Sequence, residues 1–194
     1  MKTRNWIFLI LGLCLLTPML MIGSWILTQS TLESTAGVEF CSTCHTMKPF
    51  AAAYAADIHG GANPKGLTAA CADCHLPHTG QTDYIVAKAK TGVVDVWGEF
   101  LSLFREPDWT ANLEHRGTFV YDSGCLTCHT HLAEAPDQQP AAAFGHQTYF
   151  ASEGRMQCVT CHMHVGHTDL LKHLSPTSET SSEAKTGTAD TPSE

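Results

Sequence analysis

The sequence predicts a mainly α-helical protein with much irregular structure, in which a single N-terminal transmembrane helix precedes one small domain. Three observations predict this fold class. A long uncharged apolar stretch lies near the N-terminus, three later segments carry helical patterns, and strand patterns are nearly absent. The later part of the chain also has few long apolar runs, so we expect its core to contain more than apolar side chains.

An apolar stretch from Trp6 to Leu27 is the predicted membrane span. Its 22 residues would form a helix about 33 Å long, which is enough to cross a bilayer core. Pro18 would kink this helix without excluding a span. Because Lys2 and Arg4 precede the stretch, the positive-inside rule predicts a cytoplasmic N-terminus and puts the rest of the chain outside.

A cleaved signal peptide and a lipoprotein signal are the alternatives for this segment. The first needs a short apolar region and an Ala-x-Ala-like cleavage site, and neither is evident. The second would use Cys14, but Leu13 before it is too large for that processing. We therefore interpret residues 1–32 as a retained, single-pass anchor in the bacterial cytoplasmic membrane, with Cys14 as a small apolar residue facing the lipid bilayer.

The chain after the anchor divides into two parts. Residues 33–174 form the expected folded domain, which faces the periplasm. Residues 175–194 hold no large apolar side chain and cannot bury enough surface to offset the entropy of ordering, so we expect a disordered polar tail. The formal net charge of −8 at pH 7 argues against nucleic-acid binding.

Four copies of the pattern Cys-x-x-Cys-His lie in the folded domain. The pattern is typical of covalent c-type haem attachment, in which the two thiols form thioethers with the haem vinyl groups and the histidine offers a ring nitrogen to the iron. Of the nine cysteines, only Cys14 is outside these motifs. The cysteine pairs are Cys41 and Cys44, Cys71 and Cys74, Cys125 and Cys128, and Cys158 and Cys161.

Other uses of such cysteine pairs explain the pattern less well. A zinc half-site or a dithiol redox pair uses Cys-x-x-Cys, but neither requires a histidine at the same place after all four pairs. Disulfides would also leave the histidines unexplained. We therefore expect four covalently bound c-type haems, which makes the small domain a multihaem cytochrome c domain.

The spacing of the motifs suggests two halves of two haems each. Successive motifs are 30, 54 and 33 residues apart, so the longest connection lies in the middle. The three helical segments run from Pro49 to about Ile58, from Tyr84 to about Phe104, and from Ala141 to Glu153. We expect the haems to form much of the core, and the protein without haem not to fold.

Each haem iron needs axial ligands, and each motif supplies at most one. Met47, in Cys44-His45-Thr46-Met47, is a possible ligand, and a methionine ligand raises the reduction potential relative to two histidines. Eight further histidines lie outside the motifs, at His59, His78, His115, His131, His146, His164, His167 and His173.

These features resemble the NapC/NirT/NrfH family of membrane-anchored tetrahaem quinol dehydrogenases. The resemblance covers the chain from the anchor to about Leu174. It is carried by Glu39-Phe40, the Cys-x-x-Cys-His-x-Met signature ending at Met47, Ile58-His59, Cys74-His75-Leu76-Pro77-His78, Glu114-His115-Arg116, Cys161-His162 and Gly166-His167.

The resemblance implies a set of iron ligands. Met47 rather than His45 would ligate the first iron, leaving His45 free of the metal. For the other three haems the proximal ligands would be His75, His129 and His162, and the distal candidates are His59, His146 and His167, without assignment to individual haems. His78 and His115 would each be either a ligand or a partner of a haem propionate, and His131, His164 and His173 are expected to be exposed.

The resemblance also implies a quinol pocket beside the first haem, to which Lys88 and Asp95 are assigned. They lie seven residues apart in the longest predicted helix, about two turns along one face. A carboxylate can accept a quinol proton, and a lysine can donate a hydrogen bond to a head-group oxygen. Lys90 is the alternative lysine, and two solvated charges on an amphipathic helix are the structural alternative.

The expected function is quinol-linked electron transfer. The protein would oxidise membrane quinol (menaquinol or ubiquinol) and pass electrons over four haems to a periplasmic reductase of the nitrate, nitrite or N-oxide type. One alternative is the small subunit of an ammonia-forming nitrite reductase complex. Another is a passive electron-transfer module, which gives Lys88 and Asp95 no task. A terminal reductase would need a distinct substrate site, which the sequence does not indicate, whereas electron flow into quinone would use the same residues.

Overall fold

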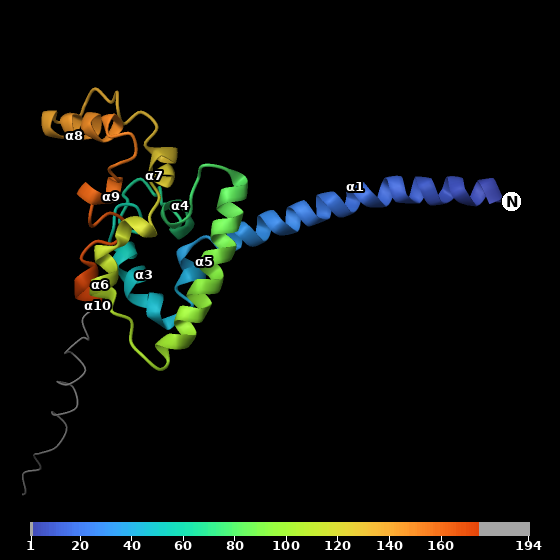
Figure 1. Ribbon diagram of the computed structural model, residues 1–194, viewed down its shortest axis with the longest axis horizontal. Coiled ribbons are helices and arrows are strands. Elements are labelled where there is room, and N and C mark those ends of the chain that lie inside the picture. Colours follow the sequence, from blue (N-terminus) through green and yellow to red (C-terminus); the bar gives the residue numbers. More distant parts are fainter. Residues whose placement is uncertain (1, 175–194) are drawn as a thin grey trace, which may run out of the picture.

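The computed structural model describes residues 2–174, with side chains from residue 5 onward. The predicted polar tail at 175–194 lies outside the described residues, as do the side chains of Lys2 and Arg4. Figure 1 shows a long helix, α1 (Lys2–Ser34), that projects from a compact helical domain. Helix α5 (Gln81–Ser102) runs across the inner end of α1, so the two long helices meet where the domain begins.

Helix α1 has the length and composition of a membrane span. Its segment Asn5–Ser34 has a mean hydropathy of 2.3, and none of its most apolar part is buried against the rest of the protein. Large apolar side chains point outward all along it, from Trp6 to Leu27. A helix that is apolar on all sides needs apolar surroundings, which a bilayer provides.

The domain is helical, and residues 2–174 contain no β-strand. The three predicted helices are present as α3 (Lys48–Ala55), α5 and α8 (Pro140–Ala151), with ends shifted by a few residues. Both α3 and α8 carry a proline in the first turn, where its missing N–H costs nothing. The sequence did not predict the short helices, which are α2 (Val38–Cys41), α4 (Cys71–His75), α6 (Trp109–Glu114), α7 (Asp122–Cys128), α9 (Cys158–Cys161), α10 (Leu170–Leu174) and the 3₁₀ turns η1 (His45–Met47) and η2 (Arg116–Thr118).

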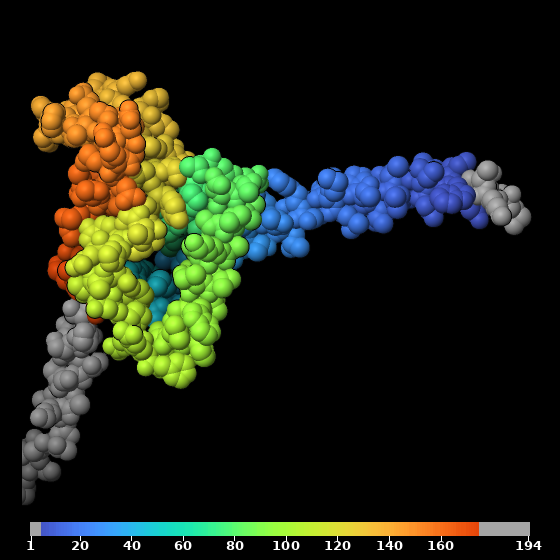
Figure 2. Space-filling view, viewed as in Figure 1, coloured from blue at the N-terminus to red at the C-terminus, as the bar shows by residue number. Residues whose placement is uncertain are grey.

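The polypeptide encloses little apolar volume by itself. Among the described residues, the buried apolar side chains are few and mostly small, and no large side chain is fully buried. Figure 2 shows the domain hollowed between α5 and the neighbouring segments. A folded domain normally depends on a close-packed apolar interior, so the missing core volume has to come from bound cofactors. The buried apolar residues are Ala53, Ala72, Leu76, Val159 and Leu170.

Two packing contacts join distant parts of the chain. Helix α10 packs on α3, and the Thr168 hydroxyl donates a hydrogen bond of 2.8 Å to the buried Asp57 carboxylate just after α3. Helix α4 packs on α7, and a Cβ added to Gly124 would lie 1.8 Å from the Asp73 carbonyl oxygen, so only glycine permits this approach. The C-terminal end of the described domain thus packs against its first half. The helices that carry the second and third motifs pack against each other.

Candidate functional site

The second, third and fourth Cys-x-x-Cys pairs each lie on one helical turn. A helix brings residues three apart onto the same face, so both thiols of each pair point to the same side. The following histidine closes the turn in two cases, because the N–H groups of His129 and His162 donate to the carbonyl oxygens of Cys125 and Cys158 at 2.9 and 3.0 Å. The first motif differs, since Cys44 is extended and the residues after it form η1.

The four motifs contact one another in chain order. The side chains of Cys41 and Cys71 lie close together. Next, the N–H of Tyr121, just before α7, donates 2.9 Å to the Cys74 carbonyl oxygen. The side chains of Cys125 and Cys158 lie close together as well. The motifs therefore form one continuous series, and the two halves suggested by their spacing are not separate in space.

Three pairs of histidine rings face each other across similar gaps. The ring centroids of His75 and His167 are 6.2 Å apart. Those of His59 and His129 are 6.3 Å apart, and those of His146 and His162 are 6.2 Å apart. Each pair joins one motif histidine to one of the three distal candidates. A metal–imidazole bond of about 2 Å puts two rings on opposite sides of one metal roughly 6 Å apart between centroids, so all three gaps fit an iron.

The hydrogen bonds of these rings leave the other ring nitrogen available to a metal. Metal-binding histidines usually donate the second ring N–H to a carbonyl or carboxylate oxygen. The His75 Nδ1 lies 2.8 Å from the Phe119 carbonyl oxygen, and the His167 Nδ1 lies 3.2 Å from that of Phe50. Because a carbonyl oxygen can only accept, the proton is on Nδ1 and Nε2 keeps its lone pair.

The other two distal candidates are held in the same way. The His59 Nδ1 lies 3.1 Å from a carboxylate oxygen of Asp57. The His146 Nδ1 lies 2.5 Å from the side-chain oxygen of Gln138, whose amide group donates to two backbone carbonyl oxygens and is thereby fixed in orientation. Asp57 and Gln138 are thus supporting residues that the sequence gave no reason to select.

Burial lowers the pKa of both His75 and His167. Their rings are therefore neutral at pH 7, which is the form that binds metal. No three His, Cys, Asp or Glu side chains within residues 5–174 converge into a metal-binding cluster. Ligands that come in opposed pairs suit a haem, whose macrocycle supplies the remaining bonds to iron.

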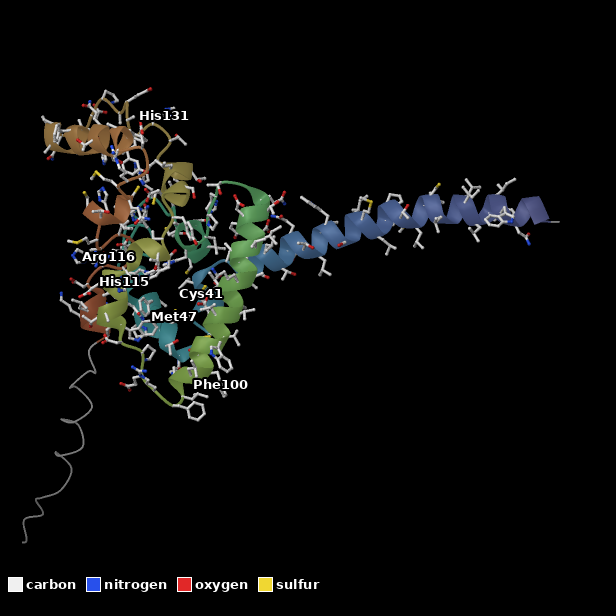
Figure 3. The ribbon with its side chains drawn as sticks, in the orientation of Figure 1. Cys41, Met47, Phe100, His115, Arg116 and His131 are labelled. Atoms are coloured by element: carbon white, nitrogen blue, oxygen red, sulfur yellow. The ribbon has the colours of Figure 1, made fainter. Side chains whose placement is uncertain are left out.

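We propose from this geometry that the second haem is ligated by His75 and His167, the third by His129 and His59, and the fourth by His162 and His146. The assignment gives each distal candidate to one haem. The first motif has no opposed histidine within the described residues, and its own His45 makes an ion pair with Glu99 on α5. Figure 3 shows Cys41 and Met47 beside α5, so the first haem would be held there with Met47 as a ligand.

The remaining histidines do not face another histidine ring in the part of the chain that the structure describes. The His78 ring lies against Tyr84, with centroids 5.5 Å apart, and its Nε2 is 3.4 Å from the Ala72 carbonyl oxygen. His115 is exposed and lies next to Arg116 near α6 (Figure 3). Neither residue is proposed as an iron ligand. The three histidines expected to be exposed, His131, His164 and His173, are exposed.

Lys88 and Asp95 both lie close to the first haem motif. Each is near enough to influence the Cys41 thiol electrostatically. The Lys88 Nζ donates to the carbonyl oxygens of Leu32 and Thr35, at 3.0 and 3.1 Å, at the point where α1 ends. Burial lowers the pKa of Lys88. Lys90, the alternative lysine, is exposed.

The environment of Asp95 makes it a better base than an ordinary carboxylate. Its side chain is accessible from solvent, yet the surrounding protein partly desolvates it and raises its pKa. A raised pKa strengthens a carboxylate as a proton acceptor. One turn further along α5, Glu99 contacts the first motif, and its i+4 spacing from Asp95 is the sequence signal that could have identified it.

The proposed pairing predicts the effect of losing one distal histidine. His59→Ala should leave the third iron with one protein ligand, since His59 is the ring that faces His129. We expect one of the low-spin haems to become high-spin, measured by electron paramagnetic resonance with haem content unchanged. His131→Ala is the matched control, because this ring is exposed and faces no other histidine ring among residues 5–174. An unchanged spectrum in His59→Ala would contradict the pairing.

Comparison with known proteins shows which family the chain resembles. A family model described as the NapC/NirT cytochrome c family, N-terminal region, matches residues 2–172. The chain is 33% identical over 156 residues to the cytochrome c-type protein TorY of Escherichia coli O157:H7, a match that covers 75% of this chain but only 41% of TorY. It is also 33% identical over 171 residues to the tetraheme c-type cytochrome CymA of Shewanella oneidensis, covering 80% of this chain and 89% of CymA.

One solved structure has a similar fold. It is a chain in the crystal structure of the cytochrome c nitrite reductase NrfHA complex bound to the HQNO inhibitor, with a TM-score of 0.54 and 24% sequence identity. The superposition covers 80% of this chain and 90% of that chain. At this identity the likeness is one of fold.

Proposed function

The chain belongs to the NapC/NirT cytochrome c family, and from that premise we propose that it oxidises membrane quinol and delivers the electrons to a periplasmic reductase. It carries four covalently bound c-type haems and an N-terminal helix that can span the membrane. The single observation that carries the proposal is the position of Lys88 and Asp95 beside the first haem motif, with Lys88 bound to the inner end of α1.

A groove offers a route from the membrane to this position. It has a volume of about 290 Å³ and lies between α1 and the start of α5, with Trp25, Gln81 and Ile85 in its lining. Leu32, whose carbonyl oxygen accepts a hydrogen bond from Lys88, also lines it. A quinol that leaves the bilayer along α1 and enters this groove would lie next to Leu32, whose carbonyl oxygen is bound by Lys88.

Lys88 would position the quinol. Its ammonium group has three donors, and two of them are used by the carbonyl oxygens of Leu32 and Thr35 within the described structure. The third can donate to an oxygen of the quinol head group. Because the two carbonyl contacts fix the nitrogen, the remaining N–H is already oriented before the quinol binds.

Asp95 would accept a proton from the quinol hydroxyl. Oxidation of one quinol to quinone releases two electrons and two protons, and the haems supply the one-electron chemistry. The raised pKa of Asp95 favours capture of the first proton, and the solvent-exposed side of the carboxyl group lets that proton leave again. The site can then accept the second proton.

The electrons would leave at the opposite end of the series. The fourth motif, on α9, and the distal His146, on α8, lie on the side of the domain away from α1 (Figure 1). We propose that this end faces the periplasm and docks the reductase, of the nitrate, nitrite or N-oxide type. A place in a nitrite reductase complex is the closest variant of this proposal, because the fold is shared with a chain of such a complex.

Reduction by quinol tests the proposal directly. In detergent-solubilised holoprotein, a water-soluble quinol analogue should reduce the haems rapidly in a stopped-flow experiment, followed by their visible absorption. Dithionite provides the control, because it reduces all four haems without a quinol site. If dithionite reduces the haems and quinol does not, the quinol proposal is wrong and a passive electron-transfer module is left.

A further inference from the structure

Glu99 on α5 binds the first haem motif through three contacts. The backbone N–H of His45 donates to Oε1 at 3.0 Å, and the Thr46 hydroxyl donates to Oε2 at 2.5 Å. The His45 ring nitrogen Nδ1 makes an ion pair with Oε1. Both carboxylate oxygens are therefore engaged by two consecutive residues of the motif.

The second ring nitrogen of His45 also faces α5. Its Nε2, which is the atom a motif histidine normally offers to iron, lies 3.5 Å from the Ser102 hydroxyl, one turn beyond Glu99. The side chain of His45 is 55% exposed, so packing alone does not fix the ring. The contacts with α5 are what give it an orientation.

The other three motif histidines have a different environment. Each faces a second histidine ring, whereas His45 faces a carboxylate and a hydroxyl. Without those contacts a histidine tethered directly to Cys44 would compete with Met47, two residues later, for the same coordination position. The contacts of the first motif thus give a physical reason why His45 would not ligate the first iron.

We propose that Glu99 is a positioning residue, which holds His45 against α5 and so leaves the first iron to Met47. This inference rests on the ligand set given above for the first haem. The choice of ligand affects the reduction potential of the first haem, because a methionine ligand raises the potential and a histidine ligand lowers it. Glu99 would then set the potential of the haem that receives electrons from quinol.

Two substitutions of Glu99 separate the ligand effect from the charge effect. Glu99→Ala removes both Glu99 contacts to His45 and leaves only the Ser102 hydroxyl near its ring, so we expect loss of the sulfur-ligand signature of the first haem in near-infrared magnetic circular dichroism and a downward shift of its midpoint potential. Glu99→Gln removes the charge but keeps an oxygen that can accept from the His45 backbone N–H. We expect this variant to retain the sulfur signature and to shift the potential slightly upward, since a nearby negative charge is lost.

Met47→Leu identifies which residue ligates the first iron. In the wild type it should abolish the sulfur signature, whereas in the Glu99→Ala background it should change nothing, because His45 has already replaced Met47. Asp83→Ala is the matched control, as it removes a carboxylate from the same helix at a position that contacts Thr79 and not the first motif. If Glu99→Ala does not mature, Thr46→Val removes one of the three contacts and should cause a partial loss of the signature.

The outcomes distinguish the role of Glu99 from the ligation of the first iron by Met47. A Glu99→Ala protein that keeps the sulfur signature with all four haems attached overturns the role of Glu99. If Met47→Leu leaves the wild-type signature unchanged, Met47 is not a ligand, and the role of Glu99 falls with it. Neither result bears on quinol oxidation, which is judged by the stopped-flow experiment described above.

Discussion

Removing the third haem should unfold the domain rather than leave a protein with three haems. The change is Cys125→Ser together with Cys128→Ser, which abolishes both thioether bonds of that motif. This motif lies in the middle of the series, because α7 packs on α4 and the Cys125 thiol contacts Cys158. Its histidine also faces His59 from the first half of the domain.

The expected size of this effect follows from the composition of the core. The largest of the five apolar side chains that are buried within residues 5–174 are those of Leu76 and Leu170, and the rest are alanine and valine. A domain of ordinary size is stable by about 5–15 kcal/mol, and full burial of a large apolar side chain contributes about 1.5–3 kcal/mol. Five small contributions cannot offset the entropy of ordering the domain, so each haem carries an essential share of the core.

Limited proteolysis of the detergent-solubilised protein measures the outcome. We expect rapid cleavage throughout the domain of the double variant, together with loss of the low-spin signals of its remaining haems. Cys14→Ser is the control, because this cysteine lies in α1 and outside all four motifs. A protease-resistant domain with three intact haems would show that the polypeptide core is sufficient without the third cofactor.

Loss of the Asp95 carboxylate should have the second large effect. In Asp95→Asn we expect the rate of haem reduction by quinol to fall by about 10²–10⁴-fold, which is the usual contribution of a positioned general base. The side chain keeps its size, so haem content and the rate of reduction by dithionite should remain unchanged. Stopped-flow absorption with each reductant measures both rates.

Lys88→Met tests the other half of the site. It keeps the aliphatic stem but removes the donors to Leu32, Thr35 and the quinol, so quinol reduction should slow as well. Lys90→Met is the matched control, since Lys90 lies on the same helix but is exposed. If Lys90→Met and Lys88→Met have equal effects, the lysine has been assigned wrongly.

The pH dependence of the same reaction follows from the raised pKa of Asp95. A base must be deprotonated to accept a proton, so the wild-type rate should fall as the pH decreases through that pKa. Because the pKa is raised, the fall begins at a higher pH than for an ordinary aspartate. In Asp95→Asn this limb of the profile should disappear, and a profile unchanged by the substitution would exclude Asp95 as the base.

Local patterns in the sequence were sufficient for much of this structure. The membrane-spanning helix, the three longer helices and the attachment motifs all depend on residues close together in the chain, and all were predicted. The short helices were missed because three to seven residues carry no periodicity. Their formation depends on packing, as the contact between α4 and α7 illustrates.

The pairing of histidines could not be read from the sequence, for two physical reasons. His75 and His167 are brought together by α10 packing on α3, which is a long-range contact. Moreover, two of the groups that orient these rings are backbone carbonyl oxygens, those of Phe119 and Phe50, which every residue type has. The residue types therefore identify the candidate histidines, whereas the fold determines which two of them face each other.

The order of the histidine pairs has a consequence for how the protein is made. On the proposed pairing, the second haem takes its distal ligand from His167, which lies beyond the fourth motif, whereas the fourth haem finds His146 before its own motif. A chain exported from its N-terminus would thus complete the fourth site locally but leave the second open until its last stretch had crossed the membrane. Maturation would then end at the second haem site, beside the first haem. Binding of His167 to the second iron would be the step that brings the C-terminal part of the domain against its N-terminal part.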